Sequence, residues 1–365
     1  MSPNKPEVFR PRRRGWGGLW RALAVTLALL VLLALLLVYA CHKYIVYDKE
    51  GVHVQFPMFG ARVTSEDEAG PSPTIYPAEL VYDEPDYASR ISTAGQNLDS
   101  LRGKYLTAGS ISPESLRAAA EQMAAAKGNA LVLQMKPPSG SLTWKSAVTM
   151  AESFEVNGSL ELAETIRELK AEYGDLRLVA VVSACVDSLM ADRYTAMALT
   201  TASGNPYADE AGNWVDPYST TVREYLGSLC RELADMGFDE IAFSYLQMPV
   251  TTAELNFSAQ LSTDPTATDA VMSLAQYLRS ALSDRHVELD IILSSDSVLQ
   301  NAASATGQDL TFLAKIFSRL CAFADGDTLP TLRERVSALE GFNPETRFVP
   351  FVHNAQIEGS WVMTG

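Results

Sequence analysis

Cysteine and histidine are scarce in this chain, whose 365 residues include four of each. No two cysteines are spaced as C-x-x-C, which argues against a structural zinc site, and four thiols spread along the chain exclude a disulfide-dense scaffold. The histidines are scattered, so we expect no catalytic metal. No G-x-G-x-x-G follows the first predicted strand and no G-x-S-x-G is present, so we expect neither a dinucleotide cofactor nor a serine nucleophile elbow.

Positive charge is also in deficit. The chain has 29 Lys and Arg against 44 Asp and Glu, a formal net charge of −15. This balance argues against nucleic acid as a partner, because binding to phosphates needs a basic surface. An apolar fraction of 47% with 20% charged residues is typical of a folded globular protein. The length accommodates one barrel-sized domain with appendages.

The N-terminal region contains a long uncharged run, ALAVTLALLVLLALLLVYA at residues 22–40. As a helix it would extend about 28 Å, close to the thickness of a bilayer's hydrocarbon core. The run is longer than the core of a cleaved signal peptide, and it ends without a good cleavage site. Residues 1–21 are basic, whereas Lys43 is the only Lys or Arg between the run and Asp48. The positive-inside rule then predicts a single-pass cell-membrane anchor with a cytoplasmic N-terminus and an extracytoplasmic C-terminal domain.

Two further segments follow the predicted anchor. Residues 44–57 contain two short β-type runs around Asp48-Lys49-Glu50-Gly51, which predicts a β-hairpin. Residues 58–100 are rich in polar residues, Pro and Gly, and we interpret them as a linker. The main domain is then expected over residues 101–365.

From about residue 100, apolar runs alternate with amphipathic helical patterns. Near-continuous apolar strands separated by helices indicate a parallel sheet. Eight such units fit an α/β fold of the (β/α)8 TIM-barrel type, with an open doubly wound sheet as the alternative. The predicted strands are residues 104–108, 129–136, 176–183, 240–246, 287–293, 320–323, 347–352 and 360–363. The predicted helices include residues 309–319.

Active residues of a TIM barrel follow the C-terminal ends of the strands, and this rule selects the candidates. The candidate catalytic carboxylates are Asp187, Asp216 and Asp296. The candidate substrate-binding residues are Lys136, Trp214, Tyr218, Ser244, Tyr245, Gln247, His353 and Trp361. Structural alternatives stay open for several of them: Asp187 could cap a turn, Lys136 could be a solvated loop cation, His353 could have a structural hydrogen bond, and both tryptophans could belong to the core.

The segment from Trp214 to Pro249 reads WVDPYSTTVREYLGSLCRELADMGFDEIAFSYLQMP. It resembles the signature of a family of uncharacterised bacterial TIM-barrel domains of glycoside-hydrolase type, in which W-x-DPY…GFDEI-x-FDY-x-RFP is typical. The similarity extends from Leu101 to the closing GSWVMT. The resemblance implies a carbohydrate ligand, such as a cell-wall saccharide, and a secreted or membrane-tethered domain.

The chain departs from this pattern at positions that carry charge in the family. Ser244 replaces the Asp of FDY, Gln247 replaces the Arg of RFP, and Gln134 replaces an Asp on the second strand. Glycoside hydrolysis usually needs two carboxyl groups roughly 5–9.5 Å apart. Glu240 is on the same face of its strand as Ser244 but about 13 Å lower, so we expect it to be structural.

Three hypotheses follow. The first is a glycan-binding or catalytically degenerate domain of glycoside-hydrolase type. The second is an active glycosidase on envelope or environmental polysaccharide, with Asp296 paired to Asp187 or Asp216. The third is a non-catalytic envelope interaction protein, which a polar-poor mouth and buried Trp214 and Trp361 would favour.

Overall fold

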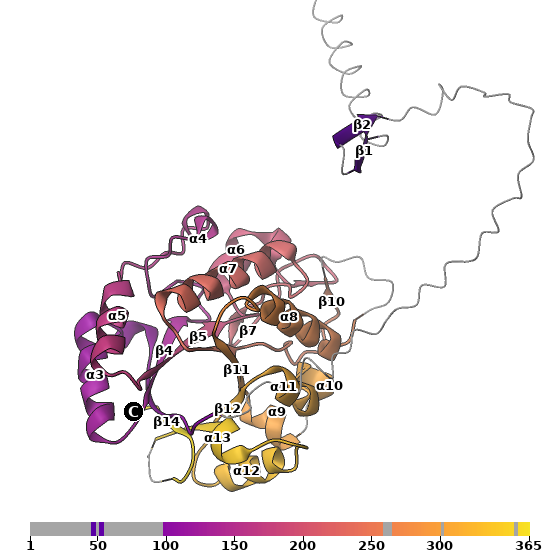
Figure 1. The fold of residues 1–365 in the computed structure, drawn as a ribbon. Coiled ribbons are helices and arrows are strands. Elements are labelled where there is room, and N and C mark those ends of the chain that lie inside the picture. Colours follow the sequence, from indigo (N-terminus) through magenta and orange to yellow (C-terminus); the bar gives the residue numbers. More distant parts are fainter. Residues whose placement is uncertain (1–44, 49–50, 55–97, 258–264, 301–302, 354–356) are drawn as a thin grey trace, which may run out of the picture. The chain divides into compact units, whose positions relative to one another are not determined.

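The computed structural model describes residues 45–48, 51–54 and 98–365, apart from 258–264, 301–302 and 354–356 (Figure 1). The chain divides into two compact units, Met1–Val81 and Tyr82–Gly365. In the first unit, β1 (Ile45–Asp48) and β2 (Gly51–Val54) pair antiparallel. No helix within the described ranges is long and apolar enough to cross a membrane. The predicted anchor at 22–40 lies outside these ranges and stays a prediction.

The second unit is built on a closed parallel barrel (Figure 1), in which each strand pairs with its neighbours and the last pairs with the first. The prediction of eight barrel strands is confirmed, with both ends within two residues for all of them, and the open doubly wound alternative is wrong. The strands are β3 (Arg102–Leu106), β4 (Ala130–Lys136), β5 (Arg177–Ser183), β9 (Glu240–Ser244), β11 (Glu288–Leu293), β12 (Arg319–Phe323), β13 (Phe348–Val352) and β14 (Trp361–Met363).

Helices surround the barrel on its outside (Figure 1). Local sequence fixes their ends: Ser112 forms a capping box at the start of α3, and Gly237, at φ 111°, ends α7 in a left-handed conformation. The helices are α3 (Pro113–Ala125), α4 (Thr149–Ser153), α5 (Ala163–Glu172), α6 (Ser188–Arg193), α7 (Thr220–Met236), α8 (Ala267–Ala281), α9 (Ser295–Gln300), α10 (Ala303–Thr306), α11 (Leu310–Ile316), α12 (Leu329–Ser337) and α13 (Pro344–Arg347).

One predicted boundary is wrong. The helix expected to run to Arg319 ends at Ile316, and Arg319 is the first residue of β12. The guanidinium of Arg319 is buried in the barrel, where its Nε donates to Glu240 Oε2 at 2.8 Å. Arg319 is therefore on a strand, although the helical sequence pattern continued to it.

The barrel interior is packed with side chains. Its middle is apolar, lined by Val132, Val181, Ala242, Ile292, Cys321 and Val349. Its floor, at the N-terminal ends of the strands, holds Glu240, Asp290 and Arg319, all buried. Burial would raise the pKa of Glu240, but Arg319, Asp290 and Arg177 outweigh it and the net pKa is lowered. Burial and the neighbouring Glu240 raise the pKa of Asp290 well above its usual range. Glu240 is therefore a structural residue of the floor, as predicted.

Candidate functional site

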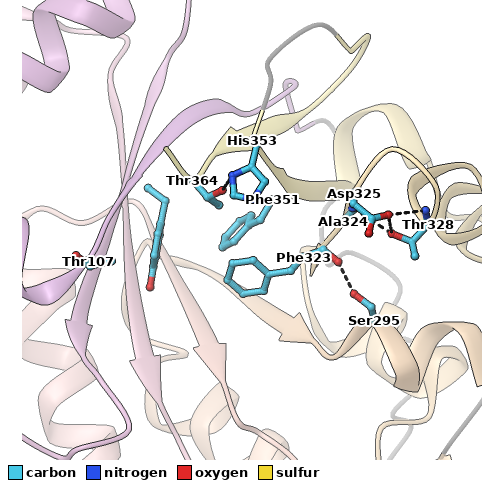
Figure 2. A pocket seen from close by; sticks show the side chains of 10 residues that line it. Thr107, Ser295, Phe323, Ala324, Asp325, Thr328, Phe351, His353 and Thr364 are labelled. Atoms are coloured by element: carbon cyan, nitrogen blue, oxygen red, sulfur yellow. Dashed lines mark hydrogen bonds between the residues drawn. The ribbon is translucent and has the colours of Figure 1, made fainter.

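Two cavities open at the C-terminal ends of the barrel strands, the mouth of the barrel. The larger has a volume of about 550 Å³ and is lined by Tyr105, Thr107, Ser295, Phe323, Ala324, Asp325, Thr328, Phe351, His353 and Thr364 (Figure 2). The smaller has about 210 Å³ and is lined by Ser244, Tyr245, Gln247, Ile292, Leu293, Ser294 and Phe323. The larger cavity is within the size range of about 300–1,000 Å³ that is usual for small-molecule sites.

Aromatic rings form one wall of the larger cavity. Phe351 lies 5.7 Å from Tyr105 and 5.0 Å from Phe323 between ring centroids, and the Phe323 contact is edge to face. Figure 2 shows Phe323 and Phe351 side by side in the mouth. Burial, with a smaller contribution from Tyr245, raises the pKa of Tyr105 to about 12, so its phenol stays neutral. Sequence reasoning did not select these three residues as site residues, although all three are on strands that it predicted.

Asp325 is the single carboxylate among the described residues that line the two cavities. Its Oδ1 accepts hydrogen bonds from the backbone N–H of Thr328 at 2.8 Å, from the Thr328 hydroxyl at 2.7 Å and from the backbone N–H of Asp327 at 3.1 Å. These bonds lower the pKa of Asp325, with the Thr328 hydroxyl contributing most. Figure 2 shows the side chain turned toward Thr328. Asp325 therefore closes a turn.

The fourth barrel strand brings three of the predicted residues to the mouth. Ser244, Tyr245 and Gln247 all line the smaller cavity. Tyr245 has φ 52°, a left-handed conformation that is strained for a residue with a bulky side chain. The backbone carbonyl of Tyr245 accepts from the N–H of Cys185 at 3.1 Å, which ties this turn to the end of β5. Ser244 therefore borders the mouth at the position where the resembled family has a carboxylate.

Lys136 and Asp187 meet each other, but not in the mouth. Lys136 Nζ lies 2.9 Å from Asp187 Oδ2, and their side chains are 0% and 2% exposed. Strict alternation along β4 would put Gln134 and Lys136 on the same face of the strand. A bulge between them changes this, because Gln134 pairs with Val181 and Lys136 with the next residue, Val182. Val182 belongs to the core outside the barrel, so Lys136 leaves the barrel interior.

Asp187 also caps helix α6. Its Oδ1 accepts from the backbone N–H of Met190 at 2.9 Å, which confirms the capping alternative. The backbone of Gly140 closes over this carboxylate, because a Cβ built there would lie 2.0 Å from Asp187 Oδ1. A ligand in either cavity is thus separated from the Lys136–Asp187 ion pair by protein.

Neither predicted tryptophan reaches the mouth surface. Trp214 and Trp361 are 1% and 5% exposed, and neither lines a mouth cavity. Trp214 packs edge to face against Tyr245 at 6.4 Å, so it supports the strained turn from behind. Trp361 is the first residue of β14, and its backbone N–H donates a hydrogen bond to the carbonyl of Leu101.

Asp216 and Tyr218 also lie outside the two cavities. Asp216 is buried, and its Oδ1 accepts from the N–H of Tyr218 at 2.8 Å. Tyr218 packs edge to face on Phe257 and under the Arg223 guanidinium. Burial raises the pKa of Tyr218 and the carboxylate of Asp269 adds to this. Through these contacts Asp216 and Tyr218 hold their loop against neighbouring residues.

Two candidates remain. His353 is exposed, lines the larger cavity, and its Nδ1 lies 3.2 Å from the Thr364 hydroxyl. Asp296 is on α9, directly after Ser295 of the larger cavity, and its side chain lies outside the described part of the structure. The catalytic and binding roles assigned from the sequence therefore stay predictions.

The described cysteines are free thiols. Cys185, Cys230 and Cys321 are all buried and unpaired. Burial raises the pKa of both Cys185 and Cys230 to about 12, so these thiols stay protonated. In the described part of the chain, no three His, Cys, Asp or Glu side chains are grouped so that they could hold a metal ion.

A closed parallel barrel with cavities at the C-terminal ends of its strands defines a TIM-barrel domain. Residues 103–323 match the model of a family described as "Putative glycosyl hydrolase domain". The chain belongs to this glycoside-hydrolase-like family. No curated protein matches the sequence.

Several solved structures are similar to this chain. A hypothetical protein from Ruminiclostridium thermocellum is 20% identical, with 52% of this chain and 96% of that one covered at a TM-score of 0.46. The PgaB (BpsB) glycoside hydrolase domain from Bordetella bronchiseptica is 13% identical, with 69% and 84% covered at a TM-score of 0.50. A chitobiase from Flavobacterium johnsoniae is 11% identical, with 69% and 38% covered at a TM-score of 0.45.

Proposed function

We propose that this chain is a membrane-anchored, extracytoplasmic glycan-binding domain whose glycoside-hydrolase site is catalytically degenerate. The observation that carries the proposal is the composition of the mouth. Its described lining combines aromatic rings and hydroxyl groups with a single carboxylate, which is hydrogen-bonded in a turn. Such a lining suits the recognition of a sugar and lacks the pair of acids that would cleave it.

The loss of catalysis follows from the position of Ser244. A retaining enzyme needs a carboxylate nucleophile about 5–5.5 Å from its acid, and an inverting enzyme needs a base about 6.5–9.5 Å away. Ser244 borders the smaller cavity, and no described residue that lines this cavity has a carboxylate. A serine hydroxyl is neutral, so it cannot balance the positive charge that develops on the sugar ring in the transition state.

The proposed location rests on the N-terminal sequence. The uncharged run at 22–40, basic residues before it and the acidic domain after it support an anchor with the domain outside. A reporter that is active only outside the cytoplasm, fused to the C-terminus, is expected to be active. Activity of a cytoplasmic reporter at the same position would overturn this part of the proposal.

The functional proposal is tested with the full-length chain purified in detergent and a panel of oligosaccharides. We expect binding by calorimetry and no released sugar by chromatography. Hydrolysis that Asp296→Asn abolishes would instead establish the active glycosidase. Asp187→Asn is a poor test of catalysis, because it leaves Lys136 as a buried charge without its partner.

A second candidate function is an envelope interaction protein. The burial of Trp214 and Trp361 favours it, since neither ring offers an exposed platform for a sugar. The same panel separates the two candidates. Absence of binding to every saccharide, by a chain that is folded, would favour the interaction protein over the glycan-binding domain.

A further inference from the structure

The two mouth cavities share one wall. Phe323 lines both of them, and among the described lining residues it is the one that they share. Two residues adjacent in sequence also lie one in each lining: Ser294 lines the smaller cavity and Ser295 the larger. The hydroxyl of Ser295 donates to the carbonyl of Phe323, which fixes the end of β12 against the start of α9. The cavities are therefore neighbours on either side of one aromatic side chain.

Phe323 is unusually accessible for a phenylalanine on a barrel strand. Its side chain is 48% exposed, whereas Phe351 beside it is 2% exposed. The edge-to-face contact with Phe351 holds the Phe323 ring in place at a centroid distance of 5.0 Å. The ring thus presents apolar surface to a ligand in the mouth. The C–H groups on one face of a hexopyranose pack well on such a ring, whose face carries partial negative charge.

The lining also indicates the charge of the ligand. Neither cavity has a lysine or an arginine among its described lining residues. The carboxylate of Asp325 is engaged by Thr328, and His353 is bonded to Thr364. Among the described lining residues, a polyanionic sugar finds no lysine or arginine, and the one carboxylate, Asp325, already accepts three hydrogen bonds, whereas the hydroxyl and amide groups suit a neutral sugar.

From these observations we propose that Phe323 separates two adjoining sugar subsites, and that the ligand is a neutral glycan of at least two hexopyranose rings. This inference rests on the proposed glycan-binding function. The larger cavity, with its wall of Tyr105, Phe323 and Phe351, takes one or more rings. The smaller cavity, with Ser244 and Gln247, takes a neighbouring ring on the other side of Phe323.

The test compares Phe323→Ala with Phe312→Ala in the full-length chain. Phe312 is also 48% exposed, but it is on α11 and lines neither cavity, so it is a matched control. Calorimetry is run with mono-, di- and tetrasaccharides of glucose, N-acetylglucosamine, mannose and galactose. We expect Phe323→Ala to weaken di- and tetrasaccharide binding on the order of tenfold, as for a residue central to an interface, and Phe312→Ala to change nothing. Phe323→Trp is expected to retain binding.

Charged probes test the second half of the inference. Glucosamine and glucuronate tetrasaccharides are expected to bind on the order of tenfold more weakly than the best neutral tetrasaccharide. Tighter binding of either charged series would overturn the neutral class. Equal affinity for a monosaccharide and its tetramer, or no effect of Phe323→Ala, would overturn the two subsites while leaving glycan binding intact. If the folded chain binds no saccharide at all, the proposed function fails and this inference fails with it.

Discussion

The ion pair between Lys136 and Asp187 gives a direct measure of how far Asp187 is structural. Asp187→Asn removes the negative charge and keeps the shape, and asparagine caps helices as well as aspartate does, so the bond from Met190 can persist. The remaining ammonium of Lys136 is 0% exposed and keeps its bond to the Ser183 carbonyl at 2.9 Å. Removing one partner of a buried pair costs about 3–5 kcal/mol, so we expect a loss of this size in the free energy of unfolding, measured in urea.

The control for this prediction is an exposed pair of the same chemistry. Lys145 and Glu161 are 3.2 Å apart with side chains 61% and 79% exposed, so Glu161→Gln is expected to cost less than about 1 kcal/mol. The double variant Lys136→Met with Asp187→Asn removes both buried charges and is expected to be more stable than Asp187→Asn alone. A loss below about 1 kcal/mol for Asp187→Asn would refute the structural role of the ion pair.

Three further predictions concern the floor, the loop over the ion pair and the missing acids. Burial raises the pKa of Asp290, so the folded state keeps a proton that the unfolded chain loses, and the free energy of unfolding falls as pH rises above the ordinary carboxyl pKa of about 4. Asp290→Asn is expected to flatten this decline, measured by urea unfolding between pH 5 and 8. An unchanged dependence of the free energy of unfolding on pH would contradict this prediction. Gly140 has φ 91°, and Gly140→Ala is expected to lower the free energy of unfolding by about 2–3 kcal/mol. Gly109 has open space around it, so Gly109→Ala is expected to cost less than about 1 kcal/mol. Equal effects of the two variants in thermal unfolding would count against the packing described. Restoring the acids of the resembled family with Gln134→Asp and Ser244→Asp is expected to raise sugar release above the wild-type level in chromatography, and a folded double variant that still binds glycan without any gain would show that more than these charges has been lost.

The sequence predicted the barrel well because its strands are short apolar runs between amphipathic helices. This pattern survives in the sequence even where individual ends are uncertain. The error at Arg319 has a physical cause, since the helical pattern runs on and nothing local reveals that its guanidinium meets Glu240 in the barrel floor. Such a long-range ion pair depends on the closed sheet.

The site was predicted only in part, and the residues explain why. Ser244, Tyr245 and Gln247 reach the mouth because Ser244 is the last residue of β9 and the other two follow it closely, although the strand was predicted to run two residues further, to 246. Lys136 does not, because a bulge that no local signal reveals turns it out of the barrel. Phe323 was overlooked because a phenylalanine at a strand end is typical of core, and only the closed barrel shows which face of β12 opens into the mouth.

The central claim is that the mouth binds a glycan and does not cleave it. One saturation-transfer NMR experiment on the full-length chain, mixed with a neutral tetrasaccharide that it binds and followed over a day, measures both parts. The account predicts transfer of saturation to the sugar protons and an unchanged tetrasaccharide spectrum throughout. The appearance of shorter saccharides, absent with Asp296→Asn, would contradict it.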